Sequence, residues 1–165
     1  MRAVCLFLIA AVSSLLAQTP APPADPVPQT TGPQATGPQA VVQQLFEAIA
    51  AHNVDAVRSL FTPNAVLLSV KDDGSPARMR YEDFVDLLAS TKNVWLERIW
   101  NATVLVHGPI AVVWAEYDFH LNGNLTHCGV DSVSLLKTTS GWKISSISDT
   151  RETSGCTSPL GPPHQ

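Results

Sequence analysis

The sequence predicts an α+β domain in which three helices precede a four-stranded antiparallel sheet. Between residues 40 and 90, apolar residues recur at the three- and four-residue spacing of amphipathic helices. From Trp95 onward the pattern changes to long runs of β-branched and aromatic residues, which favour strands. Turn residues separate these runs, and Asn122-Gly123 is typical of a two-residue hairpin loop. Helices followed by strands indicate an α+β plan, in which the sheet curls around the helices.

Each element is predicted from its local pattern. The first helix spans about 40–52, and a second short helix follows, capped by Asn53 and ended by Pro63. A third helix begins near Tyr81, and a short strand at 65–70 lies between the second and third helices. The long strands are predicted at Trp95–Val106, Ile110–Leu121, Leu125–Lys137 and Trp142–Thr150.

The chain divides into four segments. Residues 1–17 have the charged start, apolar stretch and small final residue of a secretory signal peptide. Residues 18–39 hold seven prolines and a repeated Thr-Gly-Pro-Gln-Ala, which predicts an extended, disordered linker. The folded domain is expected at 40–156, and 157–165 is expected to be a flexible tail. The protein is therefore predicted to be secreted or periplasmic.

The apolar stretch of the signal peptide is shorter than a bilayer span, which needs roughly 20 residues. No stable membrane span is expected after cleavage, and a retained anchor is the alternative. The net charge is −4 and the chain has no run of Lys or Arg, so nucleic acid is a poor candidate partner. Hydrophobic residues make up 45% and charged residues 15%, which suits a folded domain.

Two cysteines remain once the signal peptide, with Cys5, is removed. Export places Cys128 and Cys156 in an oxidising compartment, where a disulfide persists. We therefore predict a Cys128–Cys156 disulfide that pins the C-terminal end of the domain. Two independent buried thiols are the alternative.

The hairpin turns predict which side chains share a face of the sheet. A two-residue loop at Asn122-Gly123 places Asp118 opposite His127 and Trp114 opposite Asp131. A turn at Gly108-Pro109 similarly pairs Thr103 with Trp114 and Asn101 with Glu116. A four-residue loop at 138–141 pairs Leu135 with Ile144 and Asp131 with Ser148. One face is therefore expected to form a small-molecule pocket with these polar or aromatic members: Asn101, Thr103, Trp114, Glu116, Asp118, His127, Asp131 and Ser148. The opposite, convex face is expected to carry Val113, Ala115, Tyr117, Phe119 and Ile147, among others.

The predicted pocket has candidate acid–base residues. His127 opposite Asp118 would form a base with its orienting carboxylate, and Asp131 would be a second acid or base. The alternative is an exposed cross-strand ion pair near the hairpin. Asp149 and Arg151 are interpreted as exposed charges at a strand end. No HxH or HExxH spacing occurs, so neither a metal nor a cofactor is expected.

The order of elements and several short phrases resemble the nuclear transport factor 2-like superfamily. The phrases are Val41–Ile49 (VVQQLFEAI), Asp55–Phe61 (DAVRSLF), Gly108–Trp114 (GPIAVVW), Gly123–Asp131 (GNLTHCGVD) and Gly141–Ile144 (GWKI). The sequence is similar to SnoaL-like and lumazine-binding-like members, many of them exported. This resemblance implies a cone-shaped, curved antiparallel sheet packed on three N-terminal helices. It also implies a pocket inside the cone and a homodimer formed through the convex face.

The superfamily includes ketosteroid isomerases, cyclases, dehydratases and non-enzymatic modules, so the resemblance leaves the function open. The first hypothesis is a small-molecule-binding domain with an unassigned ligand. The second is a cofactor-independent cyclase, isomerase or dehydratase that uses Asp131 or His127. The third is an envelope protein-interaction module whose pocket is vestigial.

Overall fold

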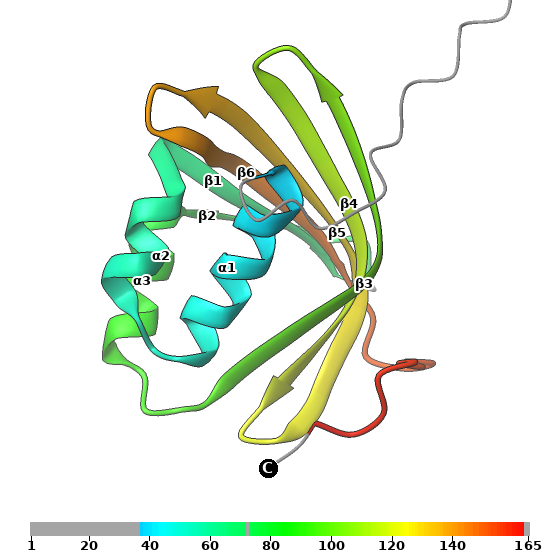
Figure 1. The fold of residues 1–165 in the computed structure, drawn as a ribbon. Helices are drawn as coiled ribbons and strands as arrows, with labels where there is room; N and C mark the ends of the chain where they lie inside the picture. The colour runs from blue at the N-terminus through cyan, green and yellow to red at the C-terminus, as the bar shows by residue number, and fades with distance from the viewer. Residues whose placement is uncertain (1–36, 72, 164–165) are drawn as a thin grey trace, which may run out of the picture.

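Three helices and a six-stranded sheet form the part of the chain that the computed structural model describes, residues 37–71 and 73–163. Figure 1 shows the helices on one side of the curved, open sheet. The elements are α1 (Pro38–Ala50), α2 (Val54–Leu60), β1 (Phe61–Lys71), β2 (Pro76–Arg80), α3 (Tyr81–Ser90), β3 (Trp95–His107), β4 (Ile110–Leu121), β5 (Asn124–Thr138) and β6 (Gly141–Arg151). The predicted α+β plan is confirmed. The predicted signal peptide and linker residues 18–36 lie outside the described residues.

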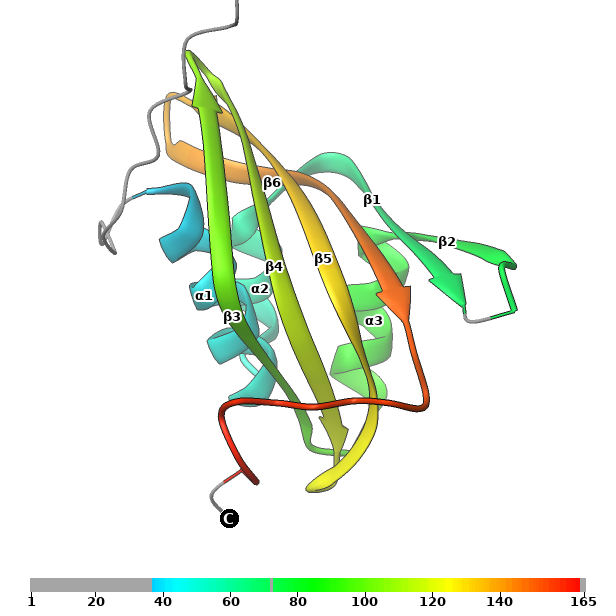
Figure 2. The same ribbon diagram turned by 90° about the vertical axis from the view of Figure 1, so that its right-hand side faces the viewer.

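The sheet has the strand order β2-β1-β6-β5-β4-β3. Strands β3 to β6 form the predicted antiparallel meander. Strand β1 joins β6 in the parallel direction, so the sheet is mixed, and β2 adds an edge strand that was not predicted. Pro63 lies inside β1 and does not end α2, which stops at Leu60. Figure 2 shows how the long strands bend around the helices.

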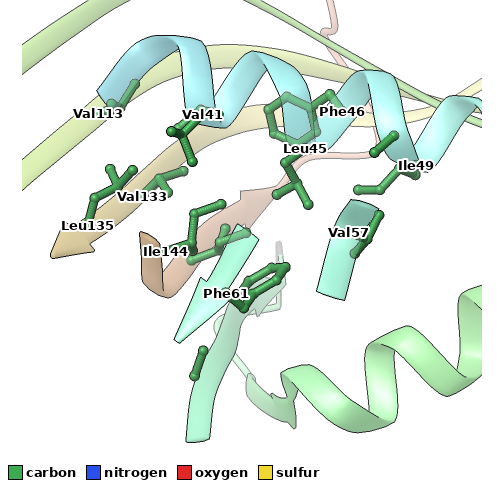
Figure 3. Close-up of a cluster of buried hydrophobic side chains, with 14 of the residues drawn as sticks. Val41, Leu45, Phe46, Ile49, Val57, Phe61, Val113, Val133, Leu135 and Ile144 are labelled. Carbon is green, nitrogen blue, oxygen red and sulfur yellow. The ribbon is translucent and has the colours of Figure 1, made fainter. Parts of the chain in front are cut away.

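Helix α1 lies across the concave face and supplies most of the helical side of the core. Its residues Val42, Leu45 and Phe46 are buried, as the apolar spacing predicted. They belong to one cluster with Val133 and Ile144 of the sheet (Figure 3). The short helix α2 is capped as predicted, because the Asn53 side chain accepts a hydrogen bond of 3.1 Å from the Ala56 amide. This core packs the helices against the concave face of the sheet.

A bulge in β5 changes the register that the Asn122-Gly123 turn sets. The first two pairs beyond the turn follow the prediction, and His120 pairs with Leu125. Thr126 is then an extra residue, so Phe119 pairs with His127 and Asp118 pairs with Cys128. The Thr126 hydroxyl donates a 3.1 Å hydrogen bond to the Phe119 carbonyl at this point. A shift of one residue turns every later side chain to the other face.

The other two hairpins contain a bulge each, with the same effect. Thr103 pairs with Trp114 as predicted, but beyond it two residues, Asn101 and Ala102, oppose one residue of β4. Leu135 pairs with Ile144 as predicted, and beyond it Ser145 is the extra residue. The predicted pairs Asp118–His127, Asn101–Glu116 and Asp131–Ser148 are therefore wrong.

Relative to the predicted faces, the bulges turn over most of β4 and parts of β3 and β6, whereas β5 keeps its predicted face. Val113, Ala115, Tyr117, Phe119 and Ile147 were predicted on the convex face. They are instead members of the buried core or of the cavity lining on the concave side. Because strands alternate their side chains, Trp114 and Val112 point to the convex side.

The segment after β6 returns across the convex face, where Figure 2 shows it in red. The predicted Cys128–Cys156 disulfide is present, with the two Cα atoms 5.7 Å apart. Two backbone hydrogen bonds between Cys128 and Glu152 hold the start of this segment. Further on, Leu160 lines a small groove with Leu96 and Arg98 at the β3 edge. Among the described residues, no helix is long and apolar enough to cross a membrane.

Candidate functional site

A cavity of about 460 Å³ lies between the concave face and the helices. Its wall is largely apolar, and its polar side chains come from the sheet and from Asn93 in the loop before β3. The helices contribute Leu45, Phe46 and Ile49 from α1 and Phe84 and Leu87 from α3; the long strands contribute Trp95, Glu97, Tyr117, Phe119, Leu121, His127, Asp131, Ile147, Asp149 and Arg151. A concave, mostly apolar cavity with a few polar groups is the usual form of a small-molecule site.

Two carboxyl groups inside this cavity share a hydrogen bond. Glu97 comes from β3 and Asp131 from β5, and their side chains bond to each other. Two carboxylates repel, so such a bond requires a proton between them. Burial, followed by the charge of Asp131, raises the pKa of Glu97 well above its usual range. Glu97 is therefore the protonated member that donates to Asp131.

Asp131 itself is almost completely buried, with 2% of its surface exposed. Burial raises the pKa of Asp131 to about 7; the bond from Glu97 lowers it and the charge of Asp149 raises it further. Its Oδ2 atom is buried and has no hydrogen-bond partner. Asp131 can therefore gain or lose a proton near neutral pH while one oxygen stays available.

Asp149 and Arg151 form an ion pair beside the carboxyl pair. The Arg151 Nε atom donates to Asp149 Oδ2 at 2.8 Å, and the Ser69 hydroxyl donates to Asp149 Oδ1 at 2.7 Å. Asp149 lies directly opposite Asp131 in the β5–β6 register. Of the two residues interpreted as exposed strand-end charges, Arg151 is exposed as predicted, whereas Asp149 is largely buried; both line the cavity.

His127 lies against aromatic rings rather than against a carboxylate. Its ring stacks on Phe119 and meets the edge of Tyr117, with centroids 5.0 and 5.8 Å away. Burial lowers the pKa of His127, and the positive charge of Arg151 lowers it further. The imidazole is therefore neutral at pH 7.

Tyr117 crosses the neighbouring strand above a glycine. Its hydroxyl donates a 2.6 Å hydrogen bond to the Thr150 carbonyl on β6, although Tyr117 itself pairs with Gly129 on β5. A Cβ atom at Gly129 would lie 2.3 Å from that carbonyl oxygen, which leaves no room for any other residue. Burial raises the pKa of Tyr117, so the phenol keeps its proton.

Of the residues predicted for the site, Asp131 and His127 line the cavity. The bulges place the rest on the other face or under the C-terminal segment. Trp114 is 54% exposed, and the Glu116 carboxylate accepts hydrogen bonds from Trp100 and Asn101 outside the cavity. Thr103 and Ser148 do not line the cavity either.

Asp118 belongs to a separate buried cluster on the convex side. The Arg98 guanidinium bonds both of its oxygens, with Nε 2.9 Å from Oδ1. His120 Nε2 lies 3.4 Å from the same carboxylate. Burial raises the pKa of Asp118, but the bonds from Arg98 and Ser158 outweigh burial and leave it below its usual value. Asp118 therefore cannot orient His127.

Glu97, Tyr117, Asp149 and Arg151 are cavity residues that the sequence analysis missed. Glu97 alone carried a detectable signal, since it lies between Trp95 and Ile99 at every second position of a strand. A carboxyl group among inward-facing apolar residues is unusual and marks a candidate site. Within the described ranges, no group of three or more His, Cys, Asp or Glu side chains is arranged to hold a metal ion.

Comparison with known proteins supports the fold. The family model described as a SnoaL-like domain matches residues 39–148. Similar solved structures include a nuclear transport factor 2-like protein of unknown function from Shewanella baltica, with 18% identity, a TM-score of 0.54, and coverage of 70% of this chain and 91% of that chain. A candidate dehydratase of the same fold family from Streptomyces avermitilis has 18% identity, a TM-score of 0.55, and coverage of 69% and 92%.

A third similar structure is the beta subunit of a candidate aromatic-ring-hydroxylating dioxygenase from Novosphingobium aromaticivorans. It has 15% identity, a TM-score of 0.58, and coverage of 76% of this chain and 94% of that chain. No curated protein matches the chain. At these identities the solved structures establish the fold alone.

Proposed function

The chain belongs to the SnoaL-like domain family, and we propose that it binds a small, mainly apolar molecule in the cavity of the cone. The observation that carries this proposal is the Glu97–Asp131 carboxyl pair, which lies in an apolar cavity and leaves Asp131 Oδ2 without a partner. An unsatisfied buried oxygen costs free energy, and a ligand that donates a hydrogen bond to it would remove that cost.

The cavity dimensions and lining support the same proposal. A volume of about 460 Å³ suits a molecule with one or two rings or a short chain. Phe119, Trp95 and Phe84 form a row of aromatic rings along one wall, with successive centroids 6.2 and 6.0 Å apart. The apolar body of the ligand would pack against these rings, while its polar group would face Asp131.

A neutral, environment-sensitive dye tests whether the cavity accepts ligands. N-phenyl-1-naphthylamine is expected to brighten on binding the wild-type domain. Leu87→Trp should abolish the signal because Leu87 lines the cavity, whereas Leu68→Trp should retain it. Both leucines are partly exposed, at 45% and 38%, so the two variants form a matched pair. An equal loss in both variants, or in neither, would contradict binding in the cavity.

A second candidate function is proton transfer to and from a bound substrate. It is favoured by one observation, the pKa of Asp131 near 7, which suits a general acid or base at neutral pH. Ionised Asp131 would accept a proton from a carbon next to a carbonyl and return it to another atom, while Glu97 donates a hydrogen bond. The Streptomyces avermitilis relative described as a candidate dehydratase fits such chemistry.

The proton-transfer candidate is tested by Asp131→Asn in a screen of small cyclic ketones and alcohols. Turnover should be lost while N-phenyl-1-naphthylamine binding is retained. An unchanged rate in the variant would remove Asp131 from any mechanism. If the dye binds and nothing is turned over, the binding function alone is retained.

We also propose that the protein is exported. The signal-like residues 1–17 and the Cys128–Cys156 disulfide support this proposal. Intact mass of the protein recovered from culture medium or periplasm should correspond to a chain that begins at Gln18. Recovery of the full-length chain from the cytoplasm alone would contradict export.

A homodimer through the convex face is the remaining proposal. The apolar side chains on the uncovered end of this face include Trp114, Leu105 and Leu136, which are 54%, 46% and 41% exposed. Trp114→Glu should convert a dimer into a monomer in sedimentation velocity measurements. A wild-type monomer would contradict the dimer and would favour the interaction-module hypothesis, in which this face meets another protein.

A further inference from the structure

The cavity contains more carboxyl groups than cations. Glu97, Asp131 and Asp149 come from three different strands, whereas the cavity lining contains two arginines, Arg78 and Arg151. Of these, Arg151 is the one whose charge acts on the pKa of both Glu97 and Asp131. Arg151 is held by Asp149 through a 2.8 Å hydrogen bond. The Glu97–Asp131 pair therefore has no ion-pair partner of its own among the described residues, and it is neutral only when Asp131 is protonated as well as Glu97.

Among the other elements that line the cavity, β2 supplies one more positive charge, the exposed Arg78, which is not among the charges that shift the pKa of Glu97 or Asp131. The lining residues of α1 and α3 are apolar, and the Ser69 hydroxyl on β1 donates its hydrogen bond to Asp149. On β4, the Tyr117 hydroxyl is directed to the Thr150 carbonyl. On β5, His127 is neutral at pH 7 because burial and Arg151 lower its pKa.

The unpartnered oxygen of Asp131 requires a hydrogen-bond donor. Only 2% of the surface of Asp131 is exposed, and its Oδ2 atom has no hydrogen-bond partner. A carboxylate oxygen bonds most strongly to a charged donor such as an ammonium group. An ammonium group would also neutralise the carboxyl pair in place of the proton on Asp131.

The aromatic wall favours the same kind of ligand. The rings of Trp95 and Phe119 are in edge contact, and both line the cavity that contains the carboxyl pair. Aromatic faces attract organic cations, and Trp is the strongest of them. In a ligand with an apolar body and one ammonium group, the carboxyl pair would match the charge and the aromatic wall would match the hydrocarbon surface.

We propose that the cavity binds a small organic amine, whose ammonium group donates to Asp131 Oδ2 and replaces the proton held by the Glu97–Asp131 pair. This inference rests on the proposed ligand-binding function and names its ligand class. The exchange is balanced: the amine enters as R–NH₃⁺, and the carboxyl pair releases up to one proton to the solvent. No covalent bond forms or breaks apart from that O–H bond.

Isothermal titration with three matched probes tests the inference: 2-phenylethylamine, 2-phenylethanol and phenylacetate. At pH 6 we expect the amine to bind at least ten-fold more tightly than either of the others. Titration in two buffers of different ionisation enthalpy should show about one proton released per amine bound. The affinity for the amine should rise between pH 6 and pH 8, because less of Asp131 is then protonated.

Variants separate the carboxyl pair from general surface charge. Asp131→Asn should reduce amine binding at least ten-fold and abolish proton release. Glu97→Gln should retain proton release, because burial keeps the pKa of Asp131 raised in its absence. Asp86→Asn, which removes an exposed carboxylate on α3, should leave amine binding and proton release unchanged. The pH dependence of the wild-type protein provides the same test if either cavity variant fails to fold.

The outcomes distinguish this inference from the proposed function on which it rests. If 2-phenylethanol or phenylacetate binds as tightly as the amine, the amine inference is overturned while ligand binding stands. If none of the three binds but N-phenyl-1-naphthylamine does, the amine inference is likewise overturned. If the dye also fails to bind, both proposals fail.

Discussion

Phe119 and His127 stack across strands β4 and β5, with ring centroids 5.0 Å apart and planes inclined by 28°. One extra residue, Thr126, creates this pairing, because without it His127 would face Asp118. The consequence is chemical as well as geometric. His127 becomes a neutral ring in an aromatic setting, and Asp118 is bound by Arg98 on the other side of the sheet. The acid–base groups of the cavity are therefore the carboxyl pair, and not a His–Asp pair.

The raised pKa of Asp131 predicts that stability falls as the pH rises. Its pKa is about 7 in the folded state and 3.8 ordinarily. Between these values the folded protein binds a proton that the unfolded chain releases, so the free energy of unfolding decreases with pH. The penalty above pH 7 is at most about 4 kcal/mol. Asp131→Asn should remove most of it, which urea unfolding at pH 5 and pH 8 will measure.

The exposed carboxylate Asp86 provides the control for this measurement. Asp86→Asn should follow the wild-type pH profile. Glu97→Gln should keep a fall in stability with pH, because burial is the main cause of the raised pKa of Asp131 and the bond from Glu97 lowers it. A profile in Asp131→Asn that stays parallel to the wild type would contradict the assignment.

The Arg98–Asp118 ion pair should contribute far more to stability than the pair on the surface. Asp118 is 1% exposed, so Arg98→Met would leave a buried carboxylate without its guanidinium partner, at a cost of about 3–5 kcal/mol. Arg80→Met removes an equivalent partner from Asp83, but that pair is exposed and should cost less than about 1 kcal/mol. Urea unfolding of both variants at pH 7 makes the comparison.

The two variants should also differ in their pH dependence. The pKa of Asp118 is lowered in the folded protein, so its contribution is present above the ordinary value and is lost as the pH falls through the folded value. The cost of Arg98→Met should therefore shrink between pH 7 and pH 3. Equal costs for Arg98→Met and Arg80→Met would show that the buried geometry has no energetic role.

Gly129 is predicted to be the least replaceable glycine of the sheet. Gly129→Ala would bring a Cβ atom to 2.3 Å from the Thr150 carbonyl oxygen, which also accepts the Tyr117 hydroxyl. We expect a loss of more than about 2 kcal/mol, since β5 and β6 must separate. Tyr117→Phe removes only the hydrogen bond and should cost about 1 kcal/mol.

Urea unfolding measures both effects, and Ser132→Ala on the same strand is the matched control. That serine points to the convex side, so its replacement should leave the urea midpoint nearly unchanged. If Gly129→Ala unfolds at the wild-type urea concentration, the close approach of Thr150 does not constrain this position.

The helices and long strands were predictable from the sequence because their signals are local. The helical spacing of Val42, Leu45 and Ile49 and the Asn122-Gly123 turn each determine structure within a few neighbouring residues. The faces of the sheet depend on exact register, and register was lost at each bulge. Thr126 and Ser145 have no sequence feature that marks them as extra residues. Their hydroxyl groups donate hydrogen bonds to carbonyl groups of neighbouring strands, and such partners are not adjacent in the sequence.

The same reasoning explains which site residues were identified. Asp131 and His127 are both on β5 beyond its bulge, so they share a face whatever the register of β4. Asp118 and Glu116 were assigned to that face from the predicted pairing of β4 with β5. The one-residue shift in that pairing places both side chains on the opposite face. The partnership of Glu97 with Asp131 joins strands that are not neighbours, which no hairpin arithmetic can predict.

The disulfide is predicted to stabilise the domain and to hold the C-terminal segment over Asp118. Cys128 and Cys156 are separated by 28 positions, and closing a loop of this length is worth on the order of 3 kcal/mol in the chain-entropy model. A domain that begins at Gln18 should show no free thiol under denaturing conditions without reductant. The double variant Cys128→Ser/Cys156→Ser should unfold at lower urea concentration, as should the wild type with dithiothreitol. Dithiothreitol should not affect the double variant. Two titratable thiols, or a midpoint that dithiothreitol leaves unchanged, would rule out this role.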